Sequence, residues 1–173
     1  MSDFIGRMPR GPRVLELGCG AGLDAEAMTA LGADVTATDG SPTMARIAEH
    51  RLGRPVRVML FDDLDDEAVY DGVWANASLL HARADALPGV LARVWRALKP
   101  GGLFYASFKS GEGEGRDRLD RYYSFLPEPA LRAAYGEAGA WATLTLSERA
   151  GGGFDGVARI WFECWAVKAT TAC

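Results

Sequence analysis

The stretch from residue 13 to residue 24, Arg-Val-Leu-Glu-Leu-Gly-Cys-Gly-Ala-Gly-Leu-Asp, limits the possible folds more than any other part of the sequence. An apolar run containing Glu16 leads into Gly18, Gly20 and Gly22, and then into a predicted helix start. Glycine has no Cβ, so the backbone can turn sharply there and approach a ligand closely. The helix that follows directs its positive end at the same place. The pattern predicts a nucleotide-type cleft at the end of a first strand.

The motif Glu16-x-Gly18-x-Gly20-x-Gly22 has its acid two positions before the first glycine. In this motif the chain resembles the class I S-adenosylmethionine-dependent methyltransferases. The resemblance implies that Glu16 orients the cofactor S-adenosyl-L-methionine, that the glycines admit it, and that S-adenosyl-L-homocysteine is the product. Residues 20–25 also fit the G-x-G-x-x-G/A pattern of dinucleotide sites, so an NAD(P)-binding Rossmann oxidoreductase is one alternative. A non-catalytic S-adenosylmethionine-binding module is another.

Asp39 is expected at the carboxyl end of a second strand, 34–38, and lies nineteen residues beyond Gly20. That spacing is close to the ~20 residues typical of an acid that binds a ribose. A carboxylate only accepts hydrogen bonds, so it can take both ribose hydroxyls at once. The next helix is expected over 41–52. The resemblance suggests that Met44 of this helix flanks the adenine, although its helical spacing suits a core position equally well.

Two further segments carry the resemblance. After a third strand, expected over 56–60, it implies that Asp63 and Leu64 lie around the adenine, but an acid-rich stretch of this kind could equally be a solvated loop. Residues 70–81 resemble the fourth strand of the same family and its catalytic end. The resemblance places Asn76 and Ala77 beside the sulfonium and His81 near the substrate, as a candidate base. A lone histidine is more often structural.

The second half of the chain predicts the far side of the sheet. Apolar residues at i, i+3, i+4 and i+7 spacing predict a helix over 85–99, and Leu-Lys-Pro-Gly-Gly followed by an apolar run matches the family's fifth strand. Residues 109–121 are glycine-rich and charged. They are expected to form either a mobile loop that contacts the substrate through Arg121 and Tyr122, or a solvated linker whose arginines pair with its own acids.

The last segments predict a helix over 129–138 and then two strands, 141–146 and 157–167, with no helix between them. Two such strands favour an antiparallel pair. We therefore expect an α/β fold, a three-layer αβα sandwich whose Rossmann-like, mostly parallel seven-stranded sheet has an antiparallel C-terminal edge strand. Residues 1–173 are expected to form a single methyltransferase domain.

Residues 1–12 are expected to be short and irregular, because Pro9 and Pro12 break a helix. The family resembled usually carries a helical segment before its first motif. Either the start is truncated, or the cofactor cleft is more open, or a partner covers it. Within the family, the chain looks most like the small stand-alone members grouped with tellurite-resistance-type and generic small-molecule methyltransferases.

Composition excludes some classes of function. The chain has a formal net charge of −4, which argues against sequence-independent nucleic-acid binding, and it has no apolar run of membrane-spanning length. Cys19, Cys164 and Cys173 are scattered and predict neither a metal site nor a disulfide framework, so we expect a reduced, cytoplasmic protein. The expected reaction is in-line transfer of a methyl group to a small-molecule acceptor, and no feature specifies an oligomeric state.

Overall fold

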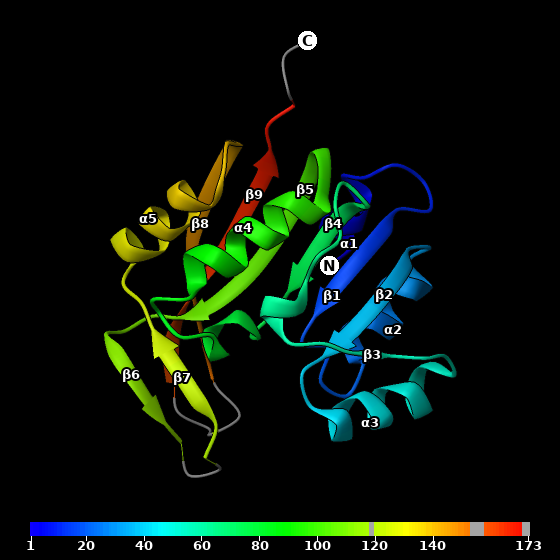
Figure 1. Cartoon of the computed structure of the whole chain (residues 1–173), viewed down its shortest axis with the longest axis horizontal. Coiled ribbons are helices and arrows are strands. Elements are labelled where there is room, and N and C mark those ends of the chain that lie inside the picture. The colour runs from blue at the N-terminus through cyan, green and yellow to red at the C-terminus, as the bar shows by residue number, and fades with distance from the viewer. Residues whose placement is uncertain (118–119, 153–157, 171–173) are drawn as a thin grey trace.

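The computed structural model describes residues 1–117, 120–152 and 158–170, and its main element is a seven-stranded sheet (Figure 1). The strand order is β3-β2-β1-β4-β5-β9-β8. The strands are β1 Arg13–Leu17, β2 Asp34–Asp39, β3 Arg57–Val58, β4 Tyr70–Ala75, β5 Leu98–Lys109, β8 Trp141–Gly152 and β9 Ala158–Lys168. The first five are parallel, and β9 runs antiparallel to both β5 and β8. The expected fold class is confirmed, with β9 one place inside the edge that β8 occupies.

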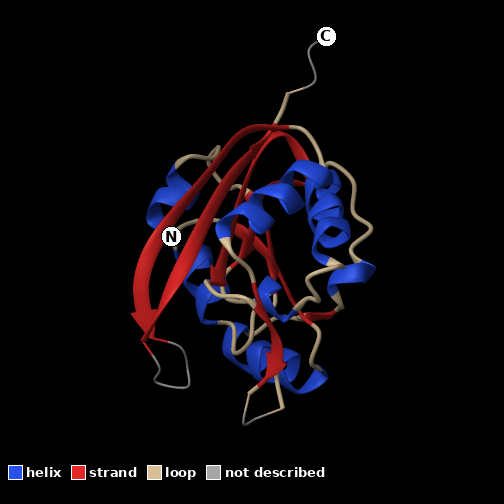
Figure 2. Ribbon diagram, turned by 90° about the vertical axis from the view of Figure 1, so that its left-hand side faces the viewer, coloured by secondary structure: helices blue, strands red, loops and turns tan. Residues whose placement is uncertain are grey.

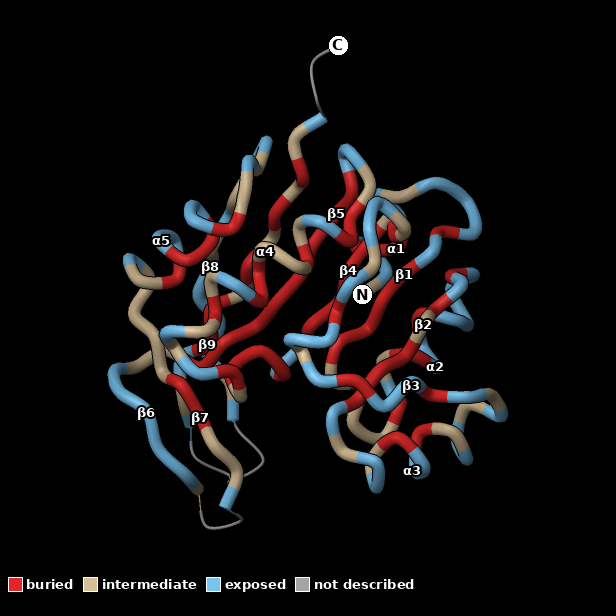
Figure 3. Tube along the Cα trace, viewed as in Figure 1, coloured by how far each residue is buried: buried red, intermediate tan, exposed pale blue. Residues whose placement is uncertain are grey.

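Helices cover both faces of this sheet. They are α1 Ser2–Gly6, α2 Leu23–Ala30, α3 Pro42–Leu52, α4 Leu87–Ala97 and α5 Glu128–Ala138, with 3-10 turns η1 Phe61–Asp63 and η2 Leu79–His81. Alternate strand residues face opposite ways, and two buried clusters result. One cluster joins the sheet to α4 and α5, and the other joins it to α1, α2 and α3. This arrangement is the three-layer sandwich, and Figure 3 shows the central strands buried between the layers.

Local signals explain where the helices begin and end. Ser41 caps α3 by accepting a hydrogen bond from the Met44 N–H at 3.4 Å, Pro42 occupies the first turn, and Gly53 ends the helix at φ 63°. The helix expected over 85–99 is shorter, because β5 already begins at Leu98. The third strand is also shorter than expected and retains only two paired residues.

The amino-terminal segment is not irregular, which corrects the sequence-based expectation. Pro9 lies beyond the end of α1 and therefore does not disturb it. Phe4 is fully buried and packs edge-to-face on Trp74, with ring centroids 5.0 Å apart. Gly72 leaves room for this contact, because a Cβ there would approach the Phe4 ring to 2.8 Å. Burial of Phe4 therefore anchors a helix that is too short to be stable alone.

Residues 109–121 are not simply a loop either. Gly113–Arg116 (β6) and Tyr122–Phe125 (β7) pair antiparallel as a separate two-stranded sheet beside the main one. The pairing satisfies the backbone groups that face the partner strand, even though β6 is exposed along its whole length (Figure 3). Figure 2 shows the two long strands that flank residues 153–157 curving along one side of the molecule. Val157, the first residue of the expected strand 157–167, and Cys173, one of the scattered cysteines, lie outside the described residues.

Among the described residues, no helix combines the length and apolar character needed to cross a membrane.

We predict that Phe4→Ala lowers the free energy of unfolding by about 3–5 kcal/mol, because it empties a fully buried aromatic site. Urea denaturation monitored by circular dichroism measures this change. The matched control is Asp3→Ala, which removes an exposed ion pair to Arg7 and should cost less than about 1 kcal/mol. Equal effects of the two variants would show that α1 is not anchored through Phe4.

Candidate active site

A cavity of about 530 Å³ lies where the carboxyl ends of β1, β2 and β4 meet the start of β7. Parallel α/β sheets bind ligands at this edge. The lining residues come from five separate segments: Gly18 and Gly20; Asp39, Gly40, Ser41 and Met44; Phe61; Ala77, Ser78 and His81; Arg121 and Tyr122. The cavity therefore brings together most of the site residues predicted from the sequence.

The glycine loop requires glycine at the positions that face the cavity. Gly18 has φ 72° and Gly20 has φ 54°, a left-handed conformation that other residues rarely adopt. A Cβ at Gly18 would come within 2.6 Å of the Ser78 Cβ, so this glycine also permits a close approach of the loops after β1 and β4. Gly22 does not line the cavity. It packs α2 against Ala48 of α3, where a Cβ would approach to 3.2 Å.

Asp39 joins two loops at the centre of the site. Its Oδ2 accepts a hydrogen bond from the Gly20 N–H at 2.8 Å, and its Oδ1 accepts one from the Ser41 N–H at 2.8 Å. Each carboxylate oxygen has a second lone pair, so both can also accept a bond from a ligand in the cavity. The carboxylate is thus held in a fixed orientation before any ligand binds.

Glu16 lies in the layer beneath the glycine loop and is only 3% exposed. Its Oε2 is buried and has no hydrogen-bond partner among the described residues. Burial, together with the nearby carboxylates of Asp24 and Asp39, raises the pKa of Glu16 to about 8. Glu16 therefore keeps its proton at neutral pH, and the nearby carboxylates of Asp24 and Asp39 form an arrangement that a cation would stabilise and an anion would not.

His81 is held in one tautomer by the hairpin that β6 and β7 form. Its Nδ1 lies 2.6 Å from the carbonyl oxygen of Tyr122, and a carbonyl only accepts, so Nδ1 carries the proton. The Nε2 atom is then the unprotonated nitrogen. Burial lowers the pKa of His81, and the charges of Arg121 and Lys109 lower it further. His81 is therefore neutral at physiological pH and can accept a proton at Nε2.

The two predicted substrate residues enter the cavity from the start of β7. Arg121 forms an ion pair with Asp117, with Nε 2.9 Å from Oδ2, which fixes the guanidinium on the hairpin. This pairing agrees with the alternative in which the arginines bind acids of their own segment. Tyr122 still lines the cavity beside His81, and Tyr123 packs on the His81 ring at 4.6 Å between centroids.

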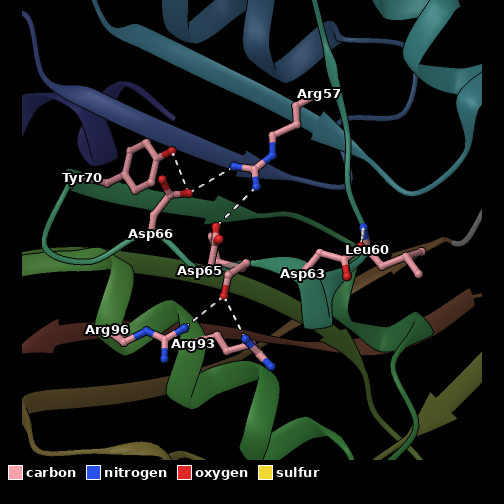
Figure 4. A network of polar contacts seen from close by, with 9 residues as sticks. Arg57, Leu60, Asp63, Asp65, Asp66, Tyr70, Arg93 and Arg96 are labelled. Carbon is pink, nitrogen blue, oxygen red and sulfur yellow. Dashed lines mark hydrogen bonds and ion pairs between the residues drawn. The ribbon is translucent and has the colours of Figure 1, made fainter.

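The other predicted residues lie outside the cavity. Asp63 is exposed, and its Oδ2 accepts a hydrogen bond from the Leu60 N–H at 3.2 Å (Figure 4). Leu64 is 1% exposed in the core, and its carbonyl accepts hydrogen bonds from the side chains of Arg93 and Arg96. Asn76 is not among the lining residues.

Several lining residues were not anticipated from the sequence. Phe61 supplies the apolar wall after β3, three positions before Leu64. The sequence does not predict this orientation of Phe61, because β3 has only two paired residues and so gives no alternating pattern from which to infer which side chains face the site. Gly40, Ser41 and Ser78 lie within two positions of Asp39 or Ala77, so the motifs indicate them only as near neighbours.

No group of three His, Cys, Asp or Glu side chains within the described ranges is placed to hold a metal ion.

Comparison with known proteins identifies the family. Residues 15–106, more than half of the chain, match the methyltransferase domain family. The chain is 39% identical over 104 residues to the ubiquinone biosynthesis O-methyltransferase of Xanthomonas campestris pv. campestris (strain B100). The alignment covers 56% of this chain and 43% of that protein. The chain thus spans less than half the length of the curated relatives it matches first.

Solved structures agree with this assignment. The 1,6-didemethyltoxoflavin-N1-methyltransferase of Burkholderia thailandensis, solved with 1,6-didemethyltoxoflavin and S-adenosylhomocysteine, aligns with a TM-score of 0.75 at 27% identity, over 97% of this chain and 76% of that one. An S-adenosylmethionine-dependent methyltransferase from Methanosarcina mazei aligns with a TM-score of 0.80 at 17% identity, over 96% and 97%, and shows a shared fold.

The chain belongs to the methyltransferase domain family, and the resemblance to class I S-adenosylmethionine-dependent methyltransferases is confirmed. The tellurite-resistance-type subgroup stays a prediction.

We predict that Glu16→Gln makes the stability of the protein less dependent on pH. The folded state keeps a proton on Glu16 up to a pKa of about 8, whereas the unfolded chain releases it near 4.5. The stabilisation is therefore complete below the unfolded pKa and is lost as pH rises through about 8, with a slope of up to about 1.4 kcal/mol per pH unit.

Urea titrations between pH 5 and about pH 9 measure this slope. Glu16→Gln should remove most of it, whereas the control Glu137→Gln, an exposed glutamate on α5, should not. If Glu16→Gln keeps the wild-type slope, the pH dependence of stability does not arise from the raised pKa of Glu16.

Proposed function

We propose that this protein binds S-adenosyl-L-methionine in the 530 Å³ cavity and transfers its methyl group to a small-molecule acceptor by in-line displacement. The observation that carries the proposal is the set of carboxylates near the glycine loop, Asp24 and Asp39, beside the protonated Glu16. The donor carries a sulfonium and an ammonium charge, and both are cations that such a set stabilises. Membership of the methyltransferase domain family supports the same chemistry.

The hydrogen bonds within the loop argue against a dinucleotide cofactor. The Cys19 N–H donates to the Thr38 carbonyl at 2.8 Å, the Gly20 N–H to Asp39 at 2.8 Å, and the Gly22 N–H to the Cys19 carbonyl at 2.9 Å. A pyrophosphate needs free N–H donors at this position. These donors are already engaged, and the nearby carboxylates of Asp24 and Asp39 would repel the phosphates. The NAD(P)-dependent alternative is therefore disfavoured.

Five of the lining residues have a proposed role toward the cofactor. Asp39 accepts hydrogen bonds from the two ribose hydroxyls, and Gly18 and Gly20 leave room for the methionine half. Met44 and Phe61 line the cavity near Asp39 and flank the adenine. When bound, the cofactor supplies an electrophilic methyl group with a good leaving group, so the protein mainly aligns the acceptor. Alignment of two reactants can lower a barrier by ~7–11 kcal/mol.

His81 is the proposed general base, and Ala77, Arg121 and Tyr122 border the position of the acceptor. Its neutral Nε2 suits an acceptor that loses a proton from an O–H or a ring N–H as it is methylated. The names of the relatives fit this class, because one is an O-methyltransferase of ubiquinone biosynthesis and another methylates N1 of 1,6-didemethyltoxoflavin. We propose a planar aromatic acceptor of small size and a cytoplasmic location, in keeping with the free thiols of Cys19 and Cys164.

Calorimetric titration with S-adenosylhomocysteine and, separately, with NADH tests the proposed cofactor. We predict that S-adenosylhomocysteine binds, that NADH does not, and that Asp39→Ala weakens binding at least tenfold, about 1.4 kcal/mol or more. The reason is that Asp39 is proposed to accept hydrogen bonds from the ribose hydroxyls and also accepts the Gly20 N–H that holds the glycine loop. The control Asp34→Ala removes an exposed carboxylate from the other end of β2 and should leave affinity unchanged. Binding of NADH alone would overturn the proposal.

We predict that His81→Gln lowers turnover at least a hundredfold while changing S-adenosylhomocysteine affinity little, because a base acts on the acceptor. Wild-type activity should rise with pH and then level off. The midpoint of the rise should lie below pH 6.5, since burial lowers the pKa of His81 from that ordinary value. A methyl-release assay over a panel of phenols and ring N–H heterocycles measures both. His50→Gln, on the exposed side of α3, is the control. Full turnover in His81→Gln would leave His81 a structural residue.

A further inference from the structure

A chain of hydrogen bonds begins at Ala77 in the cavity lining and continues beside the cavity through the buried Ser107 and the exposed Asn76. The Ala77 N–H donates to the Ser107 Oγ at 2.8 Å, and the Ser107 hydroxyl donates to the Asn76 Oδ1 at 2.8 Å. The Asn76 Nδ2 then donates to the Asp24 Oδ2 at 3.1 Å, which also accepts from the Trp74 Nε1 at 2.8 Å. The chain therefore links the strand ends of β4 and β5 to the first turn of α2.

Ser107 is the centre of this chain. It is 0% exposed, and its hydroxyl acts once as donor and once as acceptor. Neither bond can be replaced by water without opening the core between β4 and β5. Its partner Ala77 has φ 51°, a left-handed conformation that is uncommon for a residue other than glycine. Such a conformation persists when the surroundings over-determine it, and here Ser107 holds the peptide N–H.

The same chain sets the distance between two walls of the cavity. Asp24 belongs to the helix that follows the glycine loop, while Ala77 and Ser78 lie in the loop after β4. These two loops also meet directly, because a Cβ on Gly18 would lie 2.6 Å from the Ser78 Cβ. The side-chain hydrogen bonds and this backbone contact together leave the two walls little freedom to separate.

We propose that Ser107 and Asn76 are positioning residues that hold Ala77 and the two loops at the spacing needed for the methyl donor. This inference rests on the proposed function. It assigns Asn76, an exposed residue, a role beside the cavity rather than in its lining, which agrees with its absence from the lining residues. Asp24 is the anchor at the far end, because it fixes Asn76 and Trp74 with the same oxygen atom.

The first test is Ser107→Ala against Ser124→Ala. Both remove a buried serine hydroxyl, but the Ser124 Oγ has no hydrogen-bond partner among the described residues. For Ser107→Ala we expect amide hydrogen exchange of Ala77 to accelerate at least tenfold and S-adenosylhomocysteine affinity to fall about three- to tenfold. Ser124→Ala should change neither. An unchanged Ala77 exchange rate, or equal effects in the two variants, would overturn the proposal.

The second test remains informative even if Ser107→Ala does not fold. Asn76→Asp places a carboxylate against Asp24, so we expect faster Ala77 exchange and weaker S-adenosylhomocysteine binding. In the double variant Asp24→Asn with Asn76→Asp, the new amide at position 24 can donate to the new carboxylate at position 76, and Ser107 keeps its acceptor. The donating nitrogen replaces the oxygen that accepts from the Trp74 Nε1, so partial recovery relative to Asn76→Asp is expected. A double variant no better than Asn76→Asp would contradict the chain.

The two readouts separate the two proposals. If wild-type protein does not bind S-adenosylhomocysteine, the proposed function fails, but Ala77 exchange still reports on the hydrogen-bond chain. If wild-type protein binds and the variants exchange faster at Ala77 without losing affinity, the chain exists but does not position the cofactor site, and the inference is wrong.

Discussion

The site depends on one carboxylate that bridges two loops. Asp39 accepts hydrogen bonds from Gly20 and Ser41, and so ties the turn after β1 to the turn after β2. These strands are parallel neighbours, so their carboxyl ends are adjacent, and the carboxylate spans the gap between them. Charge-assisted bonds of this kind are short and directional. The loops after β1 and β2 are therefore held in a fixed arrangement, and the other lining residues surround the cavity next to them.

The charge pattern follows from the same construction. Asp39, Glu16 and Asp24 lie close enough that the neighbouring carboxylates help to raise the pKa of Glu16. Glu16 keeps its proton as a result, which leaves Asp24 and Asp39 as the negative groups that a cationic ligand in the cavity would stabilise. On the opposite side, the hairpin supplies a neutral histidine held by Tyr122. The two sides of the cavity thus differ in charge, as a cationic donor and an acceptor that loses a proton would require.

Much of this could be predicted from the sequence, because it depends on local signals. The spacing from Glu16 to Gly22 and the position of Asp39 indicated the cavity, and the alternation of apolar runs indicated the sheet. What could not be predicted depends on tertiary contacts. The helix at Phe4 forms because its side chain fills a site beside Trp74, and two prolines nearby suggested the opposite. The partners of Ser107 depend on the register between β4 and β5, which no local motif specifies.

The decisive measurement is a crystal structure of the protein with S-adenosylhomocysteine. Both ribose hydroxyls should lie within hydrogen-bond distance of the Asp39 carboxylate, and the homocysteine half should lie against Gly18 and Gly20. The adenine should lie between Met44 and Phe61. Adenosine bound on another surface, or a ribose turned away from Asp39, would show that Asp39 and the glycine loop do not form the cofactor site.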